Sequence, residues 1–488
     1  MFEHRACGGG CCGCHASRRQ FLGAVGTAAG AILAQPFFAR LLEAAEDETG
    51  PVRMAGPGGR YVPRLKAAFV RRPEYGMWWP GAIYDGEAAR RQYTDALHEA
   101  ADRLGVSVDL RGEPLYSAEE ADAWLAEADE DKPDGLVVLL LDRQEHAWPT
   151  VMKAIETGIP TVAFSPMGTS FIGQARSAAR AGAFVCATDD FSDVAYGMKM
   201  LRARAVMRRM RLMVVHGNER REGEMPFYGT HLHHVPETIW REFYEETELT
   251  PAVRAAAEEY LGAALELSGP TEADVLNGLR CYVSARRLLE AEECDAVTMN
   301  CLGAVGQGMA FPCIAFSRML DCGVPAICEA DLNASISHML LPLLFDRPGF
   351  QFNPVPVTDR NCLICSHCTC ATRLKGFDEP SVPYHVSPHH ADRDAVPVPH
   401  WEPESEVSVV WTPAGDPARM LICTGKVVEQ VQVPPAGGCV VAPMVRLDGD
   451  FDVLDVPGHH QLLFYGNWRR ELLAFCNLFG IEPILPEG

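Results

Sequence analysis

Basic residues are scarce in this chain relative to acidic ones. Lys and Arg number 43 among 488 residues, Asp and Glu number 65, and the formal net charge is -22. A chain with this balance repels the phosphate backbone of nucleic acids. Nucleic acid is therefore not an expected partner, and the 48% hydrophobic content predicts a globular protein with cores for several domains.

A long apolar run is missing as well. A spanning helix needs about 20 predominantly apolar residues, and the stretch 23–38 is short and rich in Ala and Gly. The sequence Ser-Arg-Arg-Gln-Phe-Leu at residues 17–22 precedes this stretch and has the form of a twin-arginine export motif. We therefore assign residues 1–45 to a twin-arginine signal and Cys-rich leader. The expected partner is the twin-arginine translocase, and the expected location is periplasmic or extracytoplasmic, either soluble or tethered to the membrane by an uncleaved signal.

Cysteine, in contrast, is abundant, with 18 residues. Most of the single cysteines lie in apolar contexts, where a free thiol packs as a small hydrophobe. Thiolates at a close spacing can instead hold one zinc ion or an iron–sulfur cluster. A disulfide or packed free thiols are the alternatives. The group with this close spacing consists of Cys362, Cys365, Cys368 and Cys370, with His367 inside it.

Apolar strands alternate with amphipathic helices through the first two thirds of the chain. Residues 136–141 and 159–164 are short continuous apolar runs, typical of strands that are buried on both faces. This rhythm predicts a parallel, doubly wound sheet for residues 55–182. A second unit of the same kind is predicted for residues 183–345, with a strand at residues 324–328.

The composition changes beyond residue 345. Pro, Gly, Val and Thr rise, and short strands precede a helix at residues 468–479, so residues 346–488 are predicted to form a β-rich domain. Six prolines within residues 378–403 indicate a loop there. The predicted fold class is α/β, with two Rossmann-like doubly wound domains followed by a β-rich C-terminal domain.

Two carboxylates follow the predicted strand at residues 324–328. Glu329 and Asp331 would lie at its carboxyl end, where open α/β sheets place their ligands. His459 and His460 occupy a predicted turn near the C-terminus. Carboxylates and an imidazole together can form a divalent-metal site. The alternatives are that Asp331 caps the following helix and that the histidines belong to an ordinary turn.

Five sequence blocks, in this order and spacing, resemble those of the L-fucose/L-arabinose isomerase superfamily. The resemblance covers the chain from about residue 227 to the end. The blocks are Asp-Ala-Val-Thr-Met-Asn-Cys-Leu (295–302), Phe-Pro-Cys-Ile-Ala-Phe-Ser (311–317), Gly-Val-Pro-Ala-Ile-Cys-Glu-Ala-Asp (323–331), His-Cys-Thr (367–369) and Gly-His-His-Gln-Leu-Leu-Phe-Tyr-Gly (458–466).

The resemblance implies a homo-oligomeric, metal-dependent aldose–ketose isomerase, an intramolecular oxidoreductase. In the family, a proton moves through an enediol while a divalent ion, manganese first and zinc second, polarises the oxygens of a sugar or related polyol. Asp331 resembles the family's metal-binding aspartate and His460 its late metal-binding histidine. Glu329 would be a third ligand or the base. Glu329 and Asp331 are thus the candidate catalytic residues.

One departure from the family bears on catalysis. The isomerases supply a further acidic ligand, active in acid–base chemistry, from upstream of the aspartate, whereas residues 296–320 contain no Asp or Glu. Gln307 can keep a ligand oxygen but cannot take up a proton at neutral pH, and Cys313 as a soft ligand would favour zinc or iron. The alternatives to an isomerase are therefore a non-catalytic sugar-binding homologue and a zinc- or cluster-binding redox protein centred on residues 362–370.

Overall fold

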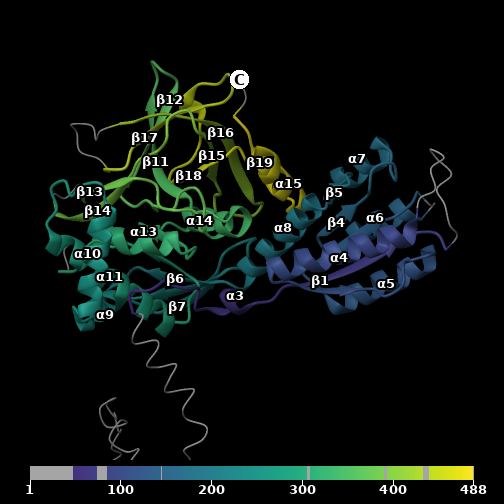
Figure 1. Cartoon of the computed structure of the whole chain (residues 1–488), viewed down its shortest axis with the longest axis horizontal. Helices are drawn as coiled ribbons and strands as arrows, with labels where there is room; N and C mark the ends of the chain where they lie inside the picture. Colours follow the sequence, from purple (N-terminus) through teal and green to yellow (C-terminus); the bar gives the residue numbers. More distant parts are fainter. Residues whose placement is uncertain are drawn as a thin grey trace, which may run out of the picture. The chain divides into compact units, whose positions relative to one another are not determined.

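A computed structural model describes residues 48–73, 85–143, 146–304, 308–389, 393–431 and 439–486. The twin-arginine motif and the leader cysteines lie outside this part of the chain. Within it, the helices are too short or too polar to cross a membrane. The molecule contains two parallel sheets covered by helices and a closed antiparallel barrel (Figure 1).

The first parallel sheet carries helices on both faces. On β1, alternate residues point to opposite faces, so that Phe69 packs with α4 and α8 whereas Val70 packs with α5 and α6. Figure 1 shows α4 and α5 on either side of β1. The strand order is β2-β1-β3-β4-β5, with β1 (Arg64–Val70), β2 (Ser107–Leu110), β3 (Gly135–Leu140), β4 (Thr161–Phe164) and β5 (Phe184–Cys186).

Capping residues set the ends of these helices. The carboxylate of Asp85 accepts hydrogen bonds from the backbone amides at the start of α4, and Gly105 ends that helix in the left-handed conformation with φ 64°. Ser117 caps α5 in the same way. The helices of this part are α3 (Pro57–Arg60), α4 (Gly86–Leu104), α5 (Ala118–Asp131), α6 (Ala147–Glu156), α7 (Ile172–Arg180) and α8 (Ser192–Arg209).

The second sheet has the order β10-β9-β6-β8-β7 and is parallel except for β7, which runs antiparallel to β8. One face packs against α9, α10, α11 and α13, and the other against α8 and α14. Its strands are β6 (Arg211–Val215), β7 (Arg221–Glu224), β8 (His231–Val235), β9 (Ala296–Met299) and β10 (Ala326–Cys328). Its helices are α9 (Glu237–Glu246), α10 (Pro251–Ala263), α11 (Glu272–Ala291), α12 (Cys301–Ala304), α13 (Cys313–Asp321) and α14 (Leu332–Phe345).

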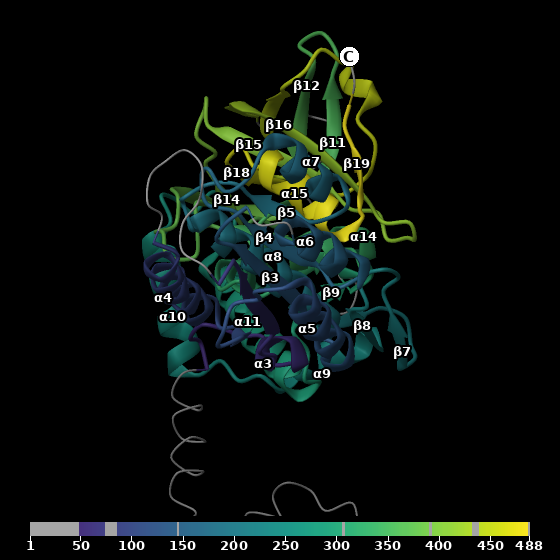
Figure 2. The same ribbon diagram turned by 90° about the vertical axis from the view of Figure 1, so that its right-hand side faces the viewer.

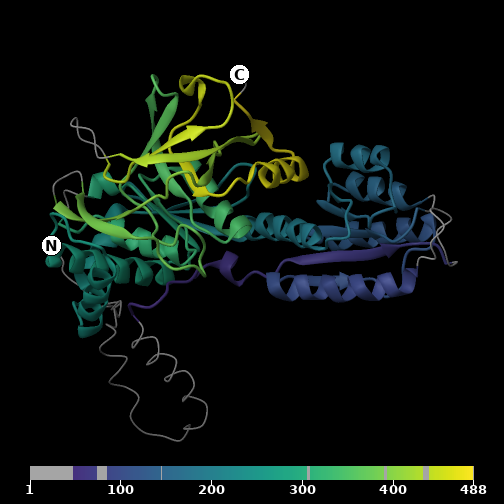
Figure 3. The same cartoon turned by 45° about the horizontal axis from the view of Figure 1, so that its top comes forward.

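The C-terminal region contains a barrel. Its strands pair in the order β15-β18-β11-β12-β17-β16, and a further pairing of β16 with β15 closes the ring and leaves β19 parallel to β16. Figures 2 and 3 show these strands with α15, in yellow, beside them. The elements are β11 (Phe350–Val357), β12 (Cys362–Ser366), β15 (Glu406–Trp411), β16 (Arg419–Gln430), β17 (Pro443–Leu447), β18 (Gln461–Tyr465), α15 (Arg469–Phe479) and β19 (Glu482–Ile484).

One prediction for this region is wrong. Residues 378–403 were expected to form a loop because of their prolines, but β13 (Tyr384–His389) and β14 (Arg393–Pro399) form an antiparallel hairpin there. β14 is an edge strand, where a proline that cannot donate to the ladder is tolerated. Residues 265–268 pair with the outer side of β13, whose Pro388 lies at an irregularity of the register.

The mixed α/β class and the β-rich C-terminal region are confirmed. Residues 49–488 belong to one compact unit. The predicted domain boundaries, at residues 182/183 and 345/346, stay predictions.

Candidate metal centre

Glu329 lies directly after β10, at the carboxyl end of the second sheet. Glu329 and Ala330 both have left-handed backbone conformations, with φ of 66° and 54°, which cost free energy in residues other than glycine. Backbone contacts hold them there: Ala330 N–H donates to Met299 O at 3.0 Å. The amide of Gln351 on β11 accepts from Cys328 N–H at 3.2 Å, which ties this turn to the barrel.

The two histidines come from the barrel. His367 follows β12 and exchanges two backbone hydrogen bonds with Val441, each 3.0 Å long. His460 precedes β18 and also has a left-handed backbone, with φ 54°. Both imidazoles are buried, at 3% and 4% exposure of the side chain.

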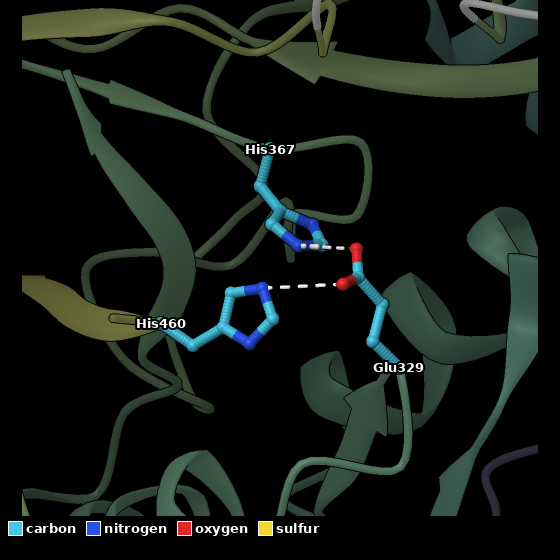
Figure 4. Close-up of side chains that lie close together, drawn as sticks. All are labelled: Glu329, His367 and His460. Atoms are coloured by element: carbon cyan, nitrogen blue, oxygen red, sulfur yellow. Dashed lines mark ion pairs between the residues drawn. The ribbon is translucent and has the colours of Figure 1, made fainter. Parts of the chain in front are cut away.

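These three side chains converge (Figure 4). Glu329 Oε1 lies 3.5 Å from His367 Nε2, and Glu329 Oε2 lies 3.4 Å from His460 Nε2. One ligand atom from each residue lies within 4.8 Å of the other two. Among the described residues, this is the one group of three or more metal-ligating side chains with such spacing.

Three of the four ring nitrogens of the two histidines are buried in the described part of the chain without a hydrogen bond. Among the described residues, both ring nitrogens of His367 and Nε2 of His460 have no hydrogen-bond partner, and the distances to Glu329 exceed the usual 2.7–3.2 Å range. A buried polar atom without a partner costs about 1–3 kcal/mol. A cation between the three groups would satisfy both Nε2 atoms and the Glu329 carboxylate.

The donor set fits a divalent transition metal. Two imidazole nitrogens and one carboxylate oxygen suit zinc, manganese or iron(II). Three protein ligands are the number typical of catalytic sites, where at least one further position is open to water or substrate. The residues present therefore fit the metal that the sequence predicted, although with one ligand that the sequence prediction had not included.

Burial and neighbouring groups shift the pKa values of the ionisable side chains at the site. The neighbouring imidazole of His367, and after it that of His460, holds the pKa of the Glu329 carboxyl well below its usual range. Burial lowers the pKa of His460, but the carboxylates of Asp331 and Glu329 outweigh burial and raise that pKa to about 9. Burial dominates at His367, whose pKa is lowered. The two ionised carboxylates outnumber the one imidazolium, so the site keeps a negative charge that attracts a cation, and a bound ion would take the place of the His460 proton.

Asp331 lies beside this group rather than among the ligand atoms. Its Oδ2 accepts a hydrogen bond from His460 Nδ1 at 2.7 Å. Its Oδ1 accepts from the backbone amides of Asn333 and Ala334, at 2.7 and 2.9 Å, and so caps α14. The structure thus places Glu329, Asp331 and His460 side by side, and the helix-capping alternative is confirmed for Asp331. The role of the three residues as metal ligands stays a prediction. A carboxylate on the outer nitrogen of a histidine orients that ring toward a metal.

The sequence prediction did not assign His367 as a ligand. The residue stands inside one of the five family-like blocks and also inside the Cys-rich stretch, where its neighbours suggested thiolate chemistry. Only the pairing of β11 with both β12 and β18 brings the residue after β12 beside the residue before β18.

The four cysteines of that stretch are dispersed. Cys362 donates to the carbonyl of Arg360 at 3.3 Å, Cys365 and Cys370 belong to the core of the second sheet and barrel, and Cys368 packs in a separate cluster with Cys313. All four are buried. Among the described residues they form no group that could hold a metal, so a zinc or cluster site here remains a prediction that this geometry does not favour.

The upstream acidic ligand of the isomerases has no counterpart in residues 296–320. Residues 296–320 supply no Asp or Glu, and Gln307 lies outside the described residues. Cys313 is buried, and burial raises the pKa of its thiol, so that it packs as a neutral group.

Comparison with known proteins identifies no family. No protein-family model and no curated protein matches the chain. The chain is similar to an ABC transporter solute-binding protein from Burkholderia multivorans, with 11% identity over 59% of this chain and 95% of that one and a TM-score of 0.19. It is also similar to a sugar-binding protein from Bacillus halodurans, with 14% identity, coverage of 51% and 79% and a TM-score of 0.17. A D-allose-bound periplasmic protein from Actinobacillus succinogenes 130z shows 13% identity, coverage of 58% and 91% and a TM-score of 0.19. At such TM-scores no property of these proteins is transferred to this chain.

Proposed function

We propose that the protein binds a divalent metal through Glu329, His367 and His460 and holds a sugar or polyol at the open positions of that ion. The observation that carries this proposal is the pair of buried imidazoles whose Nε2 atoms have no hydrogen-bond partner among the described residues and face one carboxylate. A buried histidine pair with a structural role alone would be expected to have partners.

Each residue has a separate role at such a site. When bound, a divalent ion attracts and polarises neighbouring hydroxyl and carbonyl oxygens. Glu329 supplies the negative charge, which its lowered pKa keeps available across the physiological range. Asp331 holds the His460 ring with Nε2 directed at the ion position.

Binding without turnover is the function that the geometry supports best. Isomerisation needs a group that takes up and returns a proton near neutral pH. Glu329 is a ligand with a pKa far below neutrality, and both oxygens of Asp331 are engaged. Since residues 296–320 add no carboxylate, the expected shuttle is absent from that segment.

Aldose–ketose isomerisation through an enediol is the second candidate. The five family-like blocks favour it, because two of the three ligands proposed here, Glu329 and His460, come from blocks that supply metal ligands in the isomerases. With the family we also propose that the two parallel sheets are Rossmann-like domains and that the chain forms a homo-oligomer. The twin-arginine motif at residues 17–22 supports export and an extracytoplasmic location.

Metal analysis tests the site itself. Purified protein is stripped with a chelator and titrated with Mn2+ and with Zn2+ by calorimetry, and bound metal is counted by mass spectrometry. We expect one ion per chain in the wild type and loss of that ion in Glu329→Gln and His460→Gln. His400→Gln is the matched control, because His400 is an exposed imidazole that pairs with His385 outside the site. Wild-type protein without stoichiometric metal would overturn the proposal.

A ligand screen separates the two functions. Pentoses, hexoses and polyols are titrated into metal-loaded and metal-free protein, and each aldose mixture is assayed for ketose. Metal-dependent binding without ketose supports the binding function, and ketose formation that is lost in Glu329→Gln supports the isomerase. Failure of every sugar to bind the loaded protein contradicts both.

A further inference from the structure

His338 is a buried imidazole that the metal site does not use. It lies within α14 with 1% of its surface exposed. Neither Nδ1 nor Nε2 has a hydrogen-bond partner among the described residues. A buried imidazole without partners in the middle of a helix costs free energy that a leucine would not cost, so its presence needs a physical reason.

The position of His338 points to the metal site. α14 begins at the cap residue Asp331, which holds His460. His338 stands about two helical turns further along, on the same face as Asp331. Side chains in a helix lean toward its N-terminus, which here is the end that carries the site. The groups whose charges act on His338 are His367, Asp331 and His460.

A second orphaned nitrogen lies on the neighbouring ligand. His460 donates its outer N–H to Asp331, but His367 Nδ1 has no partner among the described residues. Metal-ligating histidines almost always donate the outer N–H to a carboxylate, a carbonyl or a water, because this bond fixes the tautomer and the ring orientation. His367 therefore needs an acceptor, and His338 is a buried imidazole with a free lone pair that is close enough to feel the charge of His367.

We propose that His338 positions His367 through one buried water, which accepts the Nδ1–H of His367 and donates to a ring nitrogen of His338. The two ligand histidines are then held by different devices, a carboxylate for His460 and a neutral imidazole with water for His367. His338 is a positioning residue and not a ligand, since the group of converging ligand atoms does not include it. The inference rests on the proposed metal site.

The chemistry of His338 suits this role. Burial lowers its pKa to about 3, which keeps the ring neutral, and a neutral imidazole always has one nitrogen lone pair that can accept a hydrogen bond. A carboxylate in the same place would add a further negative charge to a buried site that Glu329 and Asp331 already supply with two. A neutral acceptor fixes the ring of His367 without changing the charge of the centre.

Two substitutions of His338 separate positioning from packing. His338→Leu keeps the bulk and removes the acceptor, whereas His338→Gln retains an amide oxygen that can accept from the water. The matched control is Met339→Leu, a change of nearly constant volume at the next buried position of α14. We expect His338→Leu to weaken Mn2+ or Zn2+ binding about 10–100-fold, with His338→Gln and Met339→Leu within a few-fold of the wild type. The melting temperature of metal-free His338→Leu should stay close to that of the wild type, which shows that the lost affinity does not come from lost folding.

A second readout does not depend on metal. Protein labelled with 15N at histidine, with the His367 signals assigned from a His367→Gln sample, reports the tautomer of His367 in long-range 1H–15N spectra. We expect the Nδ1–H tautomer in the wild type and a mixture in His338→Leu. Unchanged metal affinity and an unchanged tautomer in His338→Leu would overturn the role of His338. A wild type that binds no metal sinks the proposed function, and the tautomer then still decides the contact between the two histidines.

Discussion

At the scale of single residues, Asp331 uses its two carboxylate oxygens for different purposes. One holds the His460 ring and the other caps α14. The two readings of Asp331 that the sequence permitted, part of a metal site and helix cap, are therefore compatible. Substitutions can separate them because asparagine caps helices about as well as aspartate but carries no charge.

Asp331→Asn should weaken metal binding about 10–100-fold, because the carboxylate that orients His460 is lost, while the cap of α14 is retained. Asp331→Ala should lose the same affinity and also about 1 kcal/mol of stability from the missing cap. Calorimetric titration gives the affinities and urea unfolding of the metal-free variants gives the stabilities. Wild-type metal affinity in Asp331→Asn would show that Asp331 serves only as a cap.

Glu292 offers a pH test remote from the metal site. It accepts from both terminal nitrogens of Arg220, at 2.8 and 2.9 Å, and pairs with His233 at 2.8 Å. These contacts, Arg220 first, lower its pKa from 4.5 to about 2. Because the folded pKa lies below the unfolded one, the stabilisation is present above pH 4.5 and is lost as the pH falls toward 2.

Glu292→Gln should therefore flatten the decline of unfolding free energy between pH 5 and pH 2.5, by on the order of 2 kcal/mol. Urea unfolding across this range measures the change. The matched control is Glu290→Gln, since Glu290 forms an exposed pair with Arg286 and should leave the decline as it is. Parallel pH curves for the wild type and Glu292→Gln would contradict the prediction.

At the scale of elements, the turn before β18 places His460. Gly458 has φ 102°, and a Cβ there would lie 2.5 Å from the ring of Trp411. Only glycine fits this backbone beside that ring. The approach of β18 to the site therefore depends on a residue without a side chain.

Gly458→Ala should destabilise the fold by about 1–3 kcal/mol and weaken metal binding, because the turn must shift and carries His460 with it. Gly262→Ala in the exposed part of α10 is a control of opposite sign. A Cβ at Gly262 meets open space, and alanine in a helix is favoured over glycine by about 0.5–1 kcal/mol. Equal melting temperatures for both variants would refute the proposed steric reason.

At the scale of the whole molecule, the candidate metal would connect the second sheet to the barrel. Glu329 extends from β10, and His367 and His460 extend from strands of the barrel. The backbone N–H of Cys328 donates a hydrogen bond to the side-chain amide of Gln351 on β11, which also links the second sheet to the barrel. Metal binding is therefore expected to stabilise the folded chain and not only a local turn.

At 100 times the dissociation constant, Mn2+ or Zn2+ should add about 2.7 kcal/mol to the unfolding free energy. Calorimetric scans with metal and with chelator measure the rise in melting temperature. Glu329→Gln should abolish this rise because the junction then lacks its anionic ligand. A rise of equal size in Glu329→Gln would place the ion elsewhere.

Local patterns in the sequence determined much of this protein. Continuous apolar runs predicted the buried strands β3 and β4, which the structure places at Gly135–Leu140 and Thr161–Phe164, because burial on both faces leaves no polar position. The acidic residues after residue 328 were correctly placed at the end of a strand. The same logic failed for β13 and β14, because proline content does not reveal that β14 is an edge strand and that Pro388 of β13 lies at an irregularity of the register.

What only the tertiary structure decided is how distant segments meet. Pairing of β11 with both β12 and β18 brings His367 to His460, and the hydrogen bond between Cys328 and the Gln351 amide on β11 ties the end of β10, which Glu329 follows, to the same strand. Long-range pairings of this kind depend on the summed packing of many residues and leave no periodic trace near any one of them. Strand β10, the helix cap at Asp331 and the site carboxylate Glu329 could therefore be predicted from neighbouring residues. The participation of His367, and the position of Asp331 behind the His460 ring, could not.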